Sequence, residues 1–359
     1  RIIRQFLRRL GIVPERSRAV WKRFEHHPAV QGDPAALVSR LEDNPYLLTE
    51  VSGIGFVLAD QAAGKLGIPE AKHLVRWDGF LSLRGLAGVE RRLADEVRRL
   101  NGPAPSIPLH FPPGFTPDPD QQRALETILQ SGLVILTGGP GMGKTTLIRA
   151  CVLSAKAAGL SLLLCAPTGR AAKRMSEVTG HPAATIHRTI EWRSDGPQRH
   201  GGNPLAADWI IVDEVSMLDQ SLAYKLLCAV KKGTRLLLVG DPHQLPSVGP
   251  GNVLGDLLDS GVVPVARLTK IFRQAEFSGI PVLSQAILEG RNPSFPELEG
   301  VQFFSIDKGL PAETKQAFVV DRIAEHFRDT GERMQVLSPM KSGPLGTKEL
   351  NRHLRDLYN

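Results

Sequence analysis

The chain has 359 residues, of which 42% are hydrophobic and 23% charged, a composition typical of a globular protein with at least two domains. No apolar run approaches the ~20 residues of a membrane span, and the three cysteines show no metal-ligand spacing, so we expect a reduced, cytoplasmic protein without membrane partners. The net charge is +7, and five of these charges lie in residues 1–110, which favours a polyanionic partner such as nucleic acid.

Residues 1–100 show helical periodicity broken by glycine and proline, and we predict a small all-α domain. Within it, Gly53 and Gly55 form a Gly-x-Gly turn between two helical stretches. This pattern resembles a helix-hairpin-helix, whose turn presents backbone N–H groups to a DNA phosphate. The alternative is an αα-hairpin packed only for structure. One or two further helices are predicted over 72–100.

Residues 101–119 contain seven prolines and are predicted to form a stiff linker between domains. Beyond it, apolar stretches alternate with helical ones, which predicts a parallel α/β sheet covered on both faces. The predicted strands are 133–137, 161–165, 209–213, 235–239 and 265–268. Because ligands of such sheets bind at the carboxyl ends of strands, functional residues are expected directly after each strand.

The first of these strand ends carries a Walker A loop. Gly138 and Gly143 have the G-x-x-x-x-G-K-[ST] spacing, which Lys144 and Thr145 complete. Lys144 would reach the β- and γ-phosphates, and the Thr145 hydroxyl would hold Mg²⁺. The predicted ATP-binding residues of the loop are Gly138, Gly139, Pro140, Gly141, Met142, Gly143, Lys144, Thr145 and Thr146. The alternative is a glycine-rich strand-to-helix turn without a ligand.

Polar residues also follow the later strands. Asp213 and Glu214 occupy the Walker B position, where Asp213 would bind Mg²⁺ and Glu214 would orient and deprotonate the attacking water. Gln244 follows the next strand, and its amide could contact a γ-phosphate. Arg273 follows the last strand, and its guanidinium could stabilise the transition-state charge. By themselves, Gln244 and Arg273 could equally be ordinary loop and surface residues.

Together these blocks resemble the RecD-like helicases of superfamily 1B, which include the exodeoxyribonuclease V alpha subunit. The resemblance covers nearly the whole chain, in order and in spacing. It implies a RecA-like P-loop NTPase fold for the sheet and an ATP-hydrolysing DNA helicase. The blocks that carry it are 138–146, 166–172, 185–188, 213–217, 240–246 and 271–274.

The resemblance implies roles for individual residues. Gln244 corresponds to a glutamine that contacts the γ-phosphate and Arg273 to an arginine finger, which makes Lys144, Glu214, Gln244 and Arg273 the predicted catalytic set. Gln121 resembles a glutamine that reads adenine, although Gln122 is adjacent.

The predicted DNA contacts are Thr168, Arg170 and His187, together with Gly53 and Gly55 of the hairpin turn. Thr168 could instead cap the helix that begins near residue 169.

Two segments depart from the family pattern. The family has a β-hairpin pin before the Walker B strand, and here 193–202 lacks an aromatic tip, so the resemblance leaves a strand-separating role open. Residues 334–359 resemble the opening of a second RecA-like domain, of which we expect this sequence to hold only the start. We therefore predict a first motor domain over 120–333, with a hairpin insertion at about 193–207. Because the second domain is incomplete in this pattern, we expect the chain to behave as a helicase fragment that binds ATP but hydrolyses it poorly.

The expected function is an ATP-dependent DNA helicase of repair or recombination, with Mg²⁺, ATP, single-stranded DNA and duplex junctions as ligands and no protein partner specified. The resemblance implies 5′ to 3′ polarity. The alternatives are an RNA helicase, since phosphate contacts do not select a sugar, and a DNA-binding scaffold whose affinity ATP switches without unwinding.

Overall fold

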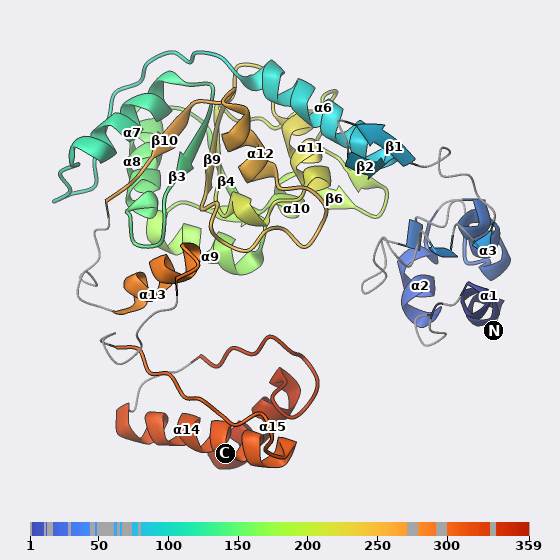
Figure 1. Cartoon of the computed structure of the whole chain (residues 1–359). Coiled ribbons are helices and arrows are strands. Elements are labelled where there is room, and N and C mark those ends of the chain that lie inside the picture. The colour runs from blue at the N-terminus through green and yellow to red at the C-terminus, as the bar shows by residue number, and fades with distance from the viewer. Residues whose placement is uncertain are drawn as a thin grey trace. The chain divides into compact units, whose positions relative to one another are not determined.

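The computed structural model divides the chain into two compact units, Arg1–Arg273 and Gln274–Asn359 (Figure 1). The structure describes residues 2–10, 12, 17–27, 30–43, 47–48, 61–62, 65–66, 74–77, 80–270, 279–291, 300–330 and 335–358. No helix in these ranges is long and apolar enough to cross a membrane.

The larger unit is built around a six-stranded sheet with the strand order β10-β3-β9-β8-β4-β5, in which all neighbouring strands run parallel. Its strands are β3 (Leu133–Thr137), β4 (Leu162–Ala166), β5 (Ala183–Thr185), β8 (Trp209–Val212), β9 (Arg235–Gly240) and β10 (Val265–Arg267). The predicted α/β fold class is confirmed. The additional strand, β5, was missed because three residues are too few to show an apolar period.

Helices cover both faces of this sheet. One face carries α6 (Arg84–Leu100), α10 (Ile186–Thr189), α11 (Gln220–Ala229) and α12 (Val253–Ser260), and the other carries α7 (Pro119–Gln130), α8 (Lys144–Ala157) and α9 (Gly169–Thr179).

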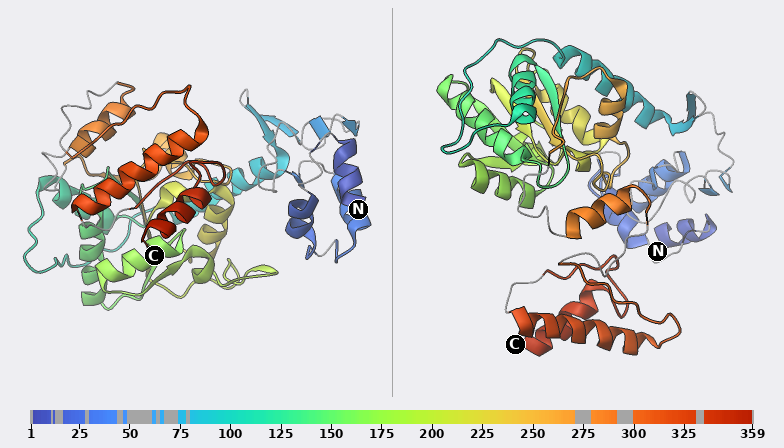
Figure 2. Two further views of the ribbon diagram at one scale, coloured as in Figure 1. Left: turned by 90° about the horizontal axis from the view of Figure 1, so that it is seen from below. Right: turned by 60° about the vertical axis from the view of Figure 1, so that its left-hand side comes forward.

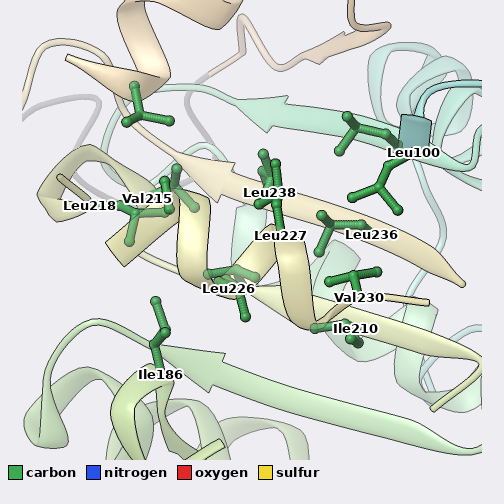
Figure 3. Packing of buried hydrophobic residues seen from close by; sticks show 14 of the residues in the cluster. Leu100, Ile186, Ile210, Val215, Leu218, Leu226, Leu227, Val230, Leu236 and Leu238 are labelled. Atoms are coloured by element: carbon green, nitrogen blue, oxygen red, sulfur yellow. The ribbon is translucent and has the colours of Figure 1, made fainter. Parts of the chain in front are cut away.

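Two separate cores follow from this arrangement. In β3, Leu133 and Ile135 belong to the first core, and Val134 and Leu136 to the second. Figure 3 shows part of the first core, which includes leucines from α11 and β9. The central strands β3, β8 and β9 are mostly apolar and fully buried, because helices cover both faces of the sheet there.

The N-terminal segment has a core of its own, which includes residues from α1 (Ile2–Arg9), α2 (Ser17–Phe24) and α3 (Pro34–Asp43). After it, β1 (Leu74–Trp77) pairs antiparallel with β2 (Phe80–Leu83) before α6 begins. The prediction of one or two helices over 72–100 is therefore wrong for 74–77 and 80–83. The Asp78-Gly79 pair between two apolar stretches is a strong hairpin signal that could have identified these strands.

The smaller unit contains α13 (Gly279–Leu288), α14 (Ala312–Thr330) and α15 (Thr347–Tyr358), and α14 contacts α15. The division after Arg273 lies inside the segment that the sequence assigned to the first motor domain. The predicted boundaries at 120, 333 and 334 stay predictions.

Candidate nucleotide site and nucleic-acid face

The loop between β3 and α8 owes its path to its glycines. Gly141 and Gly143 have φ of 77° and 90°, in the left-handed region that side chains with a β-carbon rarely adopt. Gly138 is needed for a different reason, because a β-carbon there would lie 3.0 Å from Leu268 Cβ. Gly143 is the N-cap of α8, so the helix begins at Lys144 and its first N–H groups face the loop, as an anion site requires.

Polar groups of this loop pair with one another. The Lys144 ammonium donates to the carbonyl oxygens of Gly138 and Gly139, at 3.0 Å for Gly139. The Gly139 N–H donates to Met142 Sδ at 2.9 Å. Burial lowers the pKa of Lys144, and the charge of Asp241 opposes this shift, followed by the charges of Asp213 and Glu214. The negative charges of three carboxylates therefore favour the charged form of the ammonium.

The Walker B residues lie directly after β8. Glu214 has φ 56° and ψ 42°, an uncommon left-handed conformation for a residue other than glycine. Its N–H donates to Asp213 Oδ1 at 2.9 Å. The sharp turn keeps both carboxyl groups at the carboxyl edge of the sheet, where the Walker A loop also lies.

The environment of Asp213 suits a cation. Burial raises its pKa to about 6, and the neighbouring charge of Glu214 also raises it. A carboxylate that is costly to ionise in isolation is one that a bound cation would stabilise. Carboxylate and hydroxyl oxygens are donors that Mg²⁺ accepts beside phosphate, so Asp213 and Thr145 fit this ion.

The loop after β9 packs against the segment after β8. Gly240 allows this contact, because a β-carbon there would lie 3.2 Å from the backbone nitrogen of Ser216. Ser216 belongs to η3 (Val215–Met217), and its hydroxyl donates to Gln244 Oε1 at 3.3 Å. Gln244 is thus linked to the segment that carries Asp213 and Glu214.

Asp241 and Ser216 were not singled out from the sequence. Asp241 is only 3% exposed, and its Oδ1 accepts a hydrogen bond from the His243 N–H at 3.0 Å. It follows β9 directly, as Asp213 follows β8, so the rule that functional residues follow strands could have identified it. Ser216 has no comparable signal, because its partner lies 28 residues away in the chain.

The structure gives Gln121 a local role at the start of α7. Its side-chain Oε1 accepts from the Asp118 N–H at 3.2 Å, and its own N–H donates to Asp118 Oδ1 at 2.9 Å. This is a capping box, which stabilises the first turn of a helix. Gln122 lies outside it and donates to Glu126 Oε1 at 2.9 Å. The adenine-reading role of Gln121 stays a prediction.

The predicted DNA contacts of the motor lie after two neighbouring strands, β4 and β5. Thr168 caps α9 by accepting from the Ala171 N–H at 3.2 Å, the alternative that the sequence left open. Arg170 is exposed in the first turn of that helix. Thr185 caps α10 in the same way, and exposed His187 follows it. Since β4 pairs with β5, the structure brings Arg170 and His187 to the same edge of the sheet.

Three predicted residues, Arg273, Gly53 and Gly55, lie outside the described residues.

Comparison with known proteins gives two family matches. The family model described as the HHH domain of the ATP-dependent RecD2 DNA helicase matches residues 1–80, and an AAA domain model matches residues 121–250. The predicted resemblance to the RecD-like helicases is confirmed. The second match spans the Walker A loop, the Walker B residues and Gln244.

RecD-like proteins are also among the relatives. The ATP-dependent RecD2 DNA helicase of Deinococcus radiodurans is 36% identical over 294 residues, covering 79% of this chain and 39% of that protein. The RecBCD enzyme subunit RecD of Mycolicibacterium smegmatis is 38% identical over 233 residues, covering 56% of this chain and 41% of that protein. The chain thus spans about 40% of the length of these RecD-like relatives.

A more distant likeness is to the Bacteroides Pif1 helicase in complex with ADP-AlF3 and single-stranded DNA. It has a TM-score of 0.38 at 20% identity, covering 62% of this chain and 58% of that one. A TM-score this low carries no argument about function.

Proposed function

We propose that the chain carries an ATP-dependent DNA helicase motor of the RecD-like kind, which acts in DNA repair or recombination. The observation that carries the proposal is the arrangement at one edge of the sheet. There the Walker A loop, the two Walker B carboxylates and the Ser216–Gln244 pair follow β3, β8 and β9, which are neighbours in the sheet. Hydrolysis of a nucleoside triphosphate uses a loop that binds the phosphates, carboxylates for Mg²⁺ and water, and a polar group near the γ-phosphate, and all three lie together here.

In this proposal ATP places its phosphates in the loop, and Lys144 exchanges the carbonyls of Gly138 and Gly139 for phosphate oxygens. Glu214 holds a water in line with the γ-phosphate and takes its proton. The water oxygen then bonds to phosphorus as the β–γ bridging bond breaks, which yields ADP and phosphate. Gln244 contacts the γ-phosphate, and Arg273 stabilises its charge.

Thr145 and Asp213 would hold Mg²⁺ in this site. When bound, the ion neutralises charge on the phosphate oxygens. Its ligands on this chain are one hydroxyl and one carboxylate, which matches the few protein ligands that Mg²⁺ takes beside phosphate and water.

The proposed work is movement along DNA. The Deinococcus radiodurans relative is called a DNA helicase, and the exposed Arg170 and His187 supply positive and polar groups for a strand's backbone. Comparing strand displacement on DNA and RNA forks of one sequence separates DNA from RNA helicase activity. Nucleotide-dependent DNA binding without displacement would instead favour the scaffold. The proposal names no protein partner. A cytoplasmic location stays a prediction.

The decisive experiment is Lys144→Ala, measured by binding of a fluorescent ATP analogue and by the low DNA-stimulated ATP hydrolysis that we expect of this chain. Loss of the ammonium should abolish both, because nothing else in the loop offers a cation to the phosphates. Lys156→Ala is the matched control, since Lys156 lies exposed in the last turn of the same helix and should behave as wild type. Undiminished binding and turnover in Lys144→Ala would overturn the proposal.

A further inference from the structure

A short hairpin follows α10 and extends from the sheet (Figures 1 and 2). It is formed by β6 (Trp192–Arg193) and β7 (Gly196–Pro197), which pair antiparallel. Trp192 stands at its base, one residue before the insertion that the sequence defined. We infer that Trp192, His187 and Lys225 form a subsite for one nucleotide of a single strand, an inference that rests on the proposed function.

The three side chains meet from three different elements. The Lys225 ammonium, from α11, lies 4.0 Å from the centroid of the Trp192 ring. The His187 ring, from α10, lies 5.1 Å from it at an interplanar angle of 49°. Trp192 remains 37% exposed although it is the largest side chain of the group. An exposed aromatic ring beside a cationic group is the combination that binds single-stranded nucleic acid through base stacking and phosphate attraction.

The charge around the ring is complementary to a phosphate backbone. Glu191 is paired with Arg199 at 2.6 Å, and Asp195 accepts from Gln198 Nε2 at 3.1 Å, so both carboxylates of the segment are already engaged. The chain around the ring, residues 187–199, also carries two exposed guanidinium groups, from Arg188 and Arg193. The net local charge is therefore positive.

The backbone fixes where the ring lies. Glu191, directly before Trp192, has φ 51°, a left-handed conformation that costs free energy for a residue with a β-carbon. The ion pair with Arg199 holds that residue in place. The turn thus brings the indole next to His187 of the preceding helix, at the same edge of the sheet as Arg170.

Base and phosphate would use different members of the subsite. The flat indole offers a stacking face to any base, while Lys225 is a point charge on a flexible stem. When a base stacks on the indole, the ammonium moves from the ring face to the adjacent phosphate, and His187 contacts the same backbone. The ring and the ammonium therefore exchange one cation–π contact for a stacked base and an ion pair. This contact uses the base of the hairpin, so it does not require an aromatic residue at the tip.

The first test measures binding of labelled oligothymidylate by the full chain. Trp192→Ala should weaken binding roughly 5- to 150-fold, the range for loss of one stacked base. Trp192→Phe should retain most of the affinity, because a phenyl ring still stacks. The oligonucleotide should quench tryptophan emission in the wild type, and Trp192→Phe should lose this quenching although Trp21, Trp77 and Trp209 remain.

The second test separates phosphate from base contact. A plot of log affinity against log salt has a negative slope, and Lys225→Met should make it shallower by about 0.7, the value for one phosphate contact of a single strand. Lys232→Met is the matched control, since exposed Lys232 precedes β9 at the opposite edge of the sheet, and its slope should equal that of the wild type.

Two results would overturn the subsite. Wild-type affinity in Trp192→Ala would show that the ring does not contact DNA. Equal losses in Trp192→Ala and Trp192→Phe, with earlier thermal unfolding of the larger unit in both, would show that the indole only anchors the hairpin. If Lys144→Ala abolishes ATP binding while Trp192→Ala binds DNA normally, the subsite fails and the proposed function stands. If the wild type binds no single strand, both fail.

Discussion

The carboxyl group of Asp213 lies where burial disfavours its ionised form. Its carboxyl group is half-buried beside Glu214, and burial is the larger cause of its raised pKa. A structural role alone would favour an uncharged side chain at this position. A carboxylate kept at a cost in stability is common at functional sites, where the protein uses the charge for a ligand.

We predict that Asp213→Asn raises the free energy of unfolding at pH 7. Because the pKa of Asp213 is about 6 in the folded chain and 3.8 normally, the folded state binds more protons between these values. Its contribution to stability is therefore present below about pH 4 and lost as pH rises to about 6. The expected gain is on the order of 2 kcal/mol. Urea titrations across this pH range measure it, and an unchanged pH slope would contradict it.

A second prediction concerns Ser216, whose hydroxyl donates a hydrogen bond to the side-chain oxygen of Gln244. Ser216→Ala should lower the affinity for ATP by about 1 kcal/mol while leaving affinity for ADP unchanged, because only ATP has the γ-phosphate that Gln244 would contact. Gln244→Ala should have the same effect. The double variant should be no worse than either single one, since the two residues act as a pair. Additive losses would show independent roles.

At the scale of elements, the contact between β9 and η3 joins two strand ends. Gly240 ends β9, and a β-carbon there would lie 2.7 Å from Leu254 Cδ2 and 3.2 Å from the Ser216 nitrogen. The Leu254 methyl group could move, but the backbone nitrogen could not without displacing η3. Glycine at this position therefore sets the distance between the Walker B segment and the loop of Gln244.

We predict that Gly240→Ala destabilises the chain by about 1–3 kcal/mol, the cost of overpacking a buried contact. It should also weaken ATP binding, because η3 moves relative to Gln244. Thermal and urea unfolding measure the first effect and nucleotide titration the second. Gly88→Ala in α6 is the control, since its β-carbon meets nothing within 4 Å and should stabilise the helix by about 0.5–1 kcal/mol. Similar behaviour of the two variants would contradict the prediction.

At the scale of the whole molecule, every described residue of the proposed nucleotide site lies in the unit Arg1–Arg273. A ligand stabilises only the folded part that binds it. Chains with separate units also unfold in more than one step, so one Tm does not describe them.

Calorimetry should therefore resolve nucleotide stabilisation of one unit only. ATP with Mg²⁺ at about 100 times Kd should stabilise the larger unit by about 2.7 kcal/mol and leave the transition of Gln274–Asn359 in place. Lys144→Ala should remove the shift. An equal shift of both transitions would show that the smaller unit also binds nucleotide or unfolds together with the larger one.

The sequence alone determined the fold class and the residues of the Walker loops. Short-range rules suffice there, since a glycine spacing or an apolar run contains its whole signal within a few residues. The paired strands 74–77 and 80–83 also have a local signal, the Asp78-Gly79 pair in the sequence, whereas the three-residue strand β5 is shorter than periodicity can detect.

The strand order and the pairings between distant residues required the tertiary structure. Only the sheet shows that β10 lies beside β3, that Asp241 lies near Lys144, and that Ser216 holds Gln244. The Walker A loop is the part of the site determined by sequence, whereas its carboxylate and amide surroundings depend on how parallel strands are ordered. That order depends on long-range packing of helices on both faces, and no local pattern in the chain encodes it.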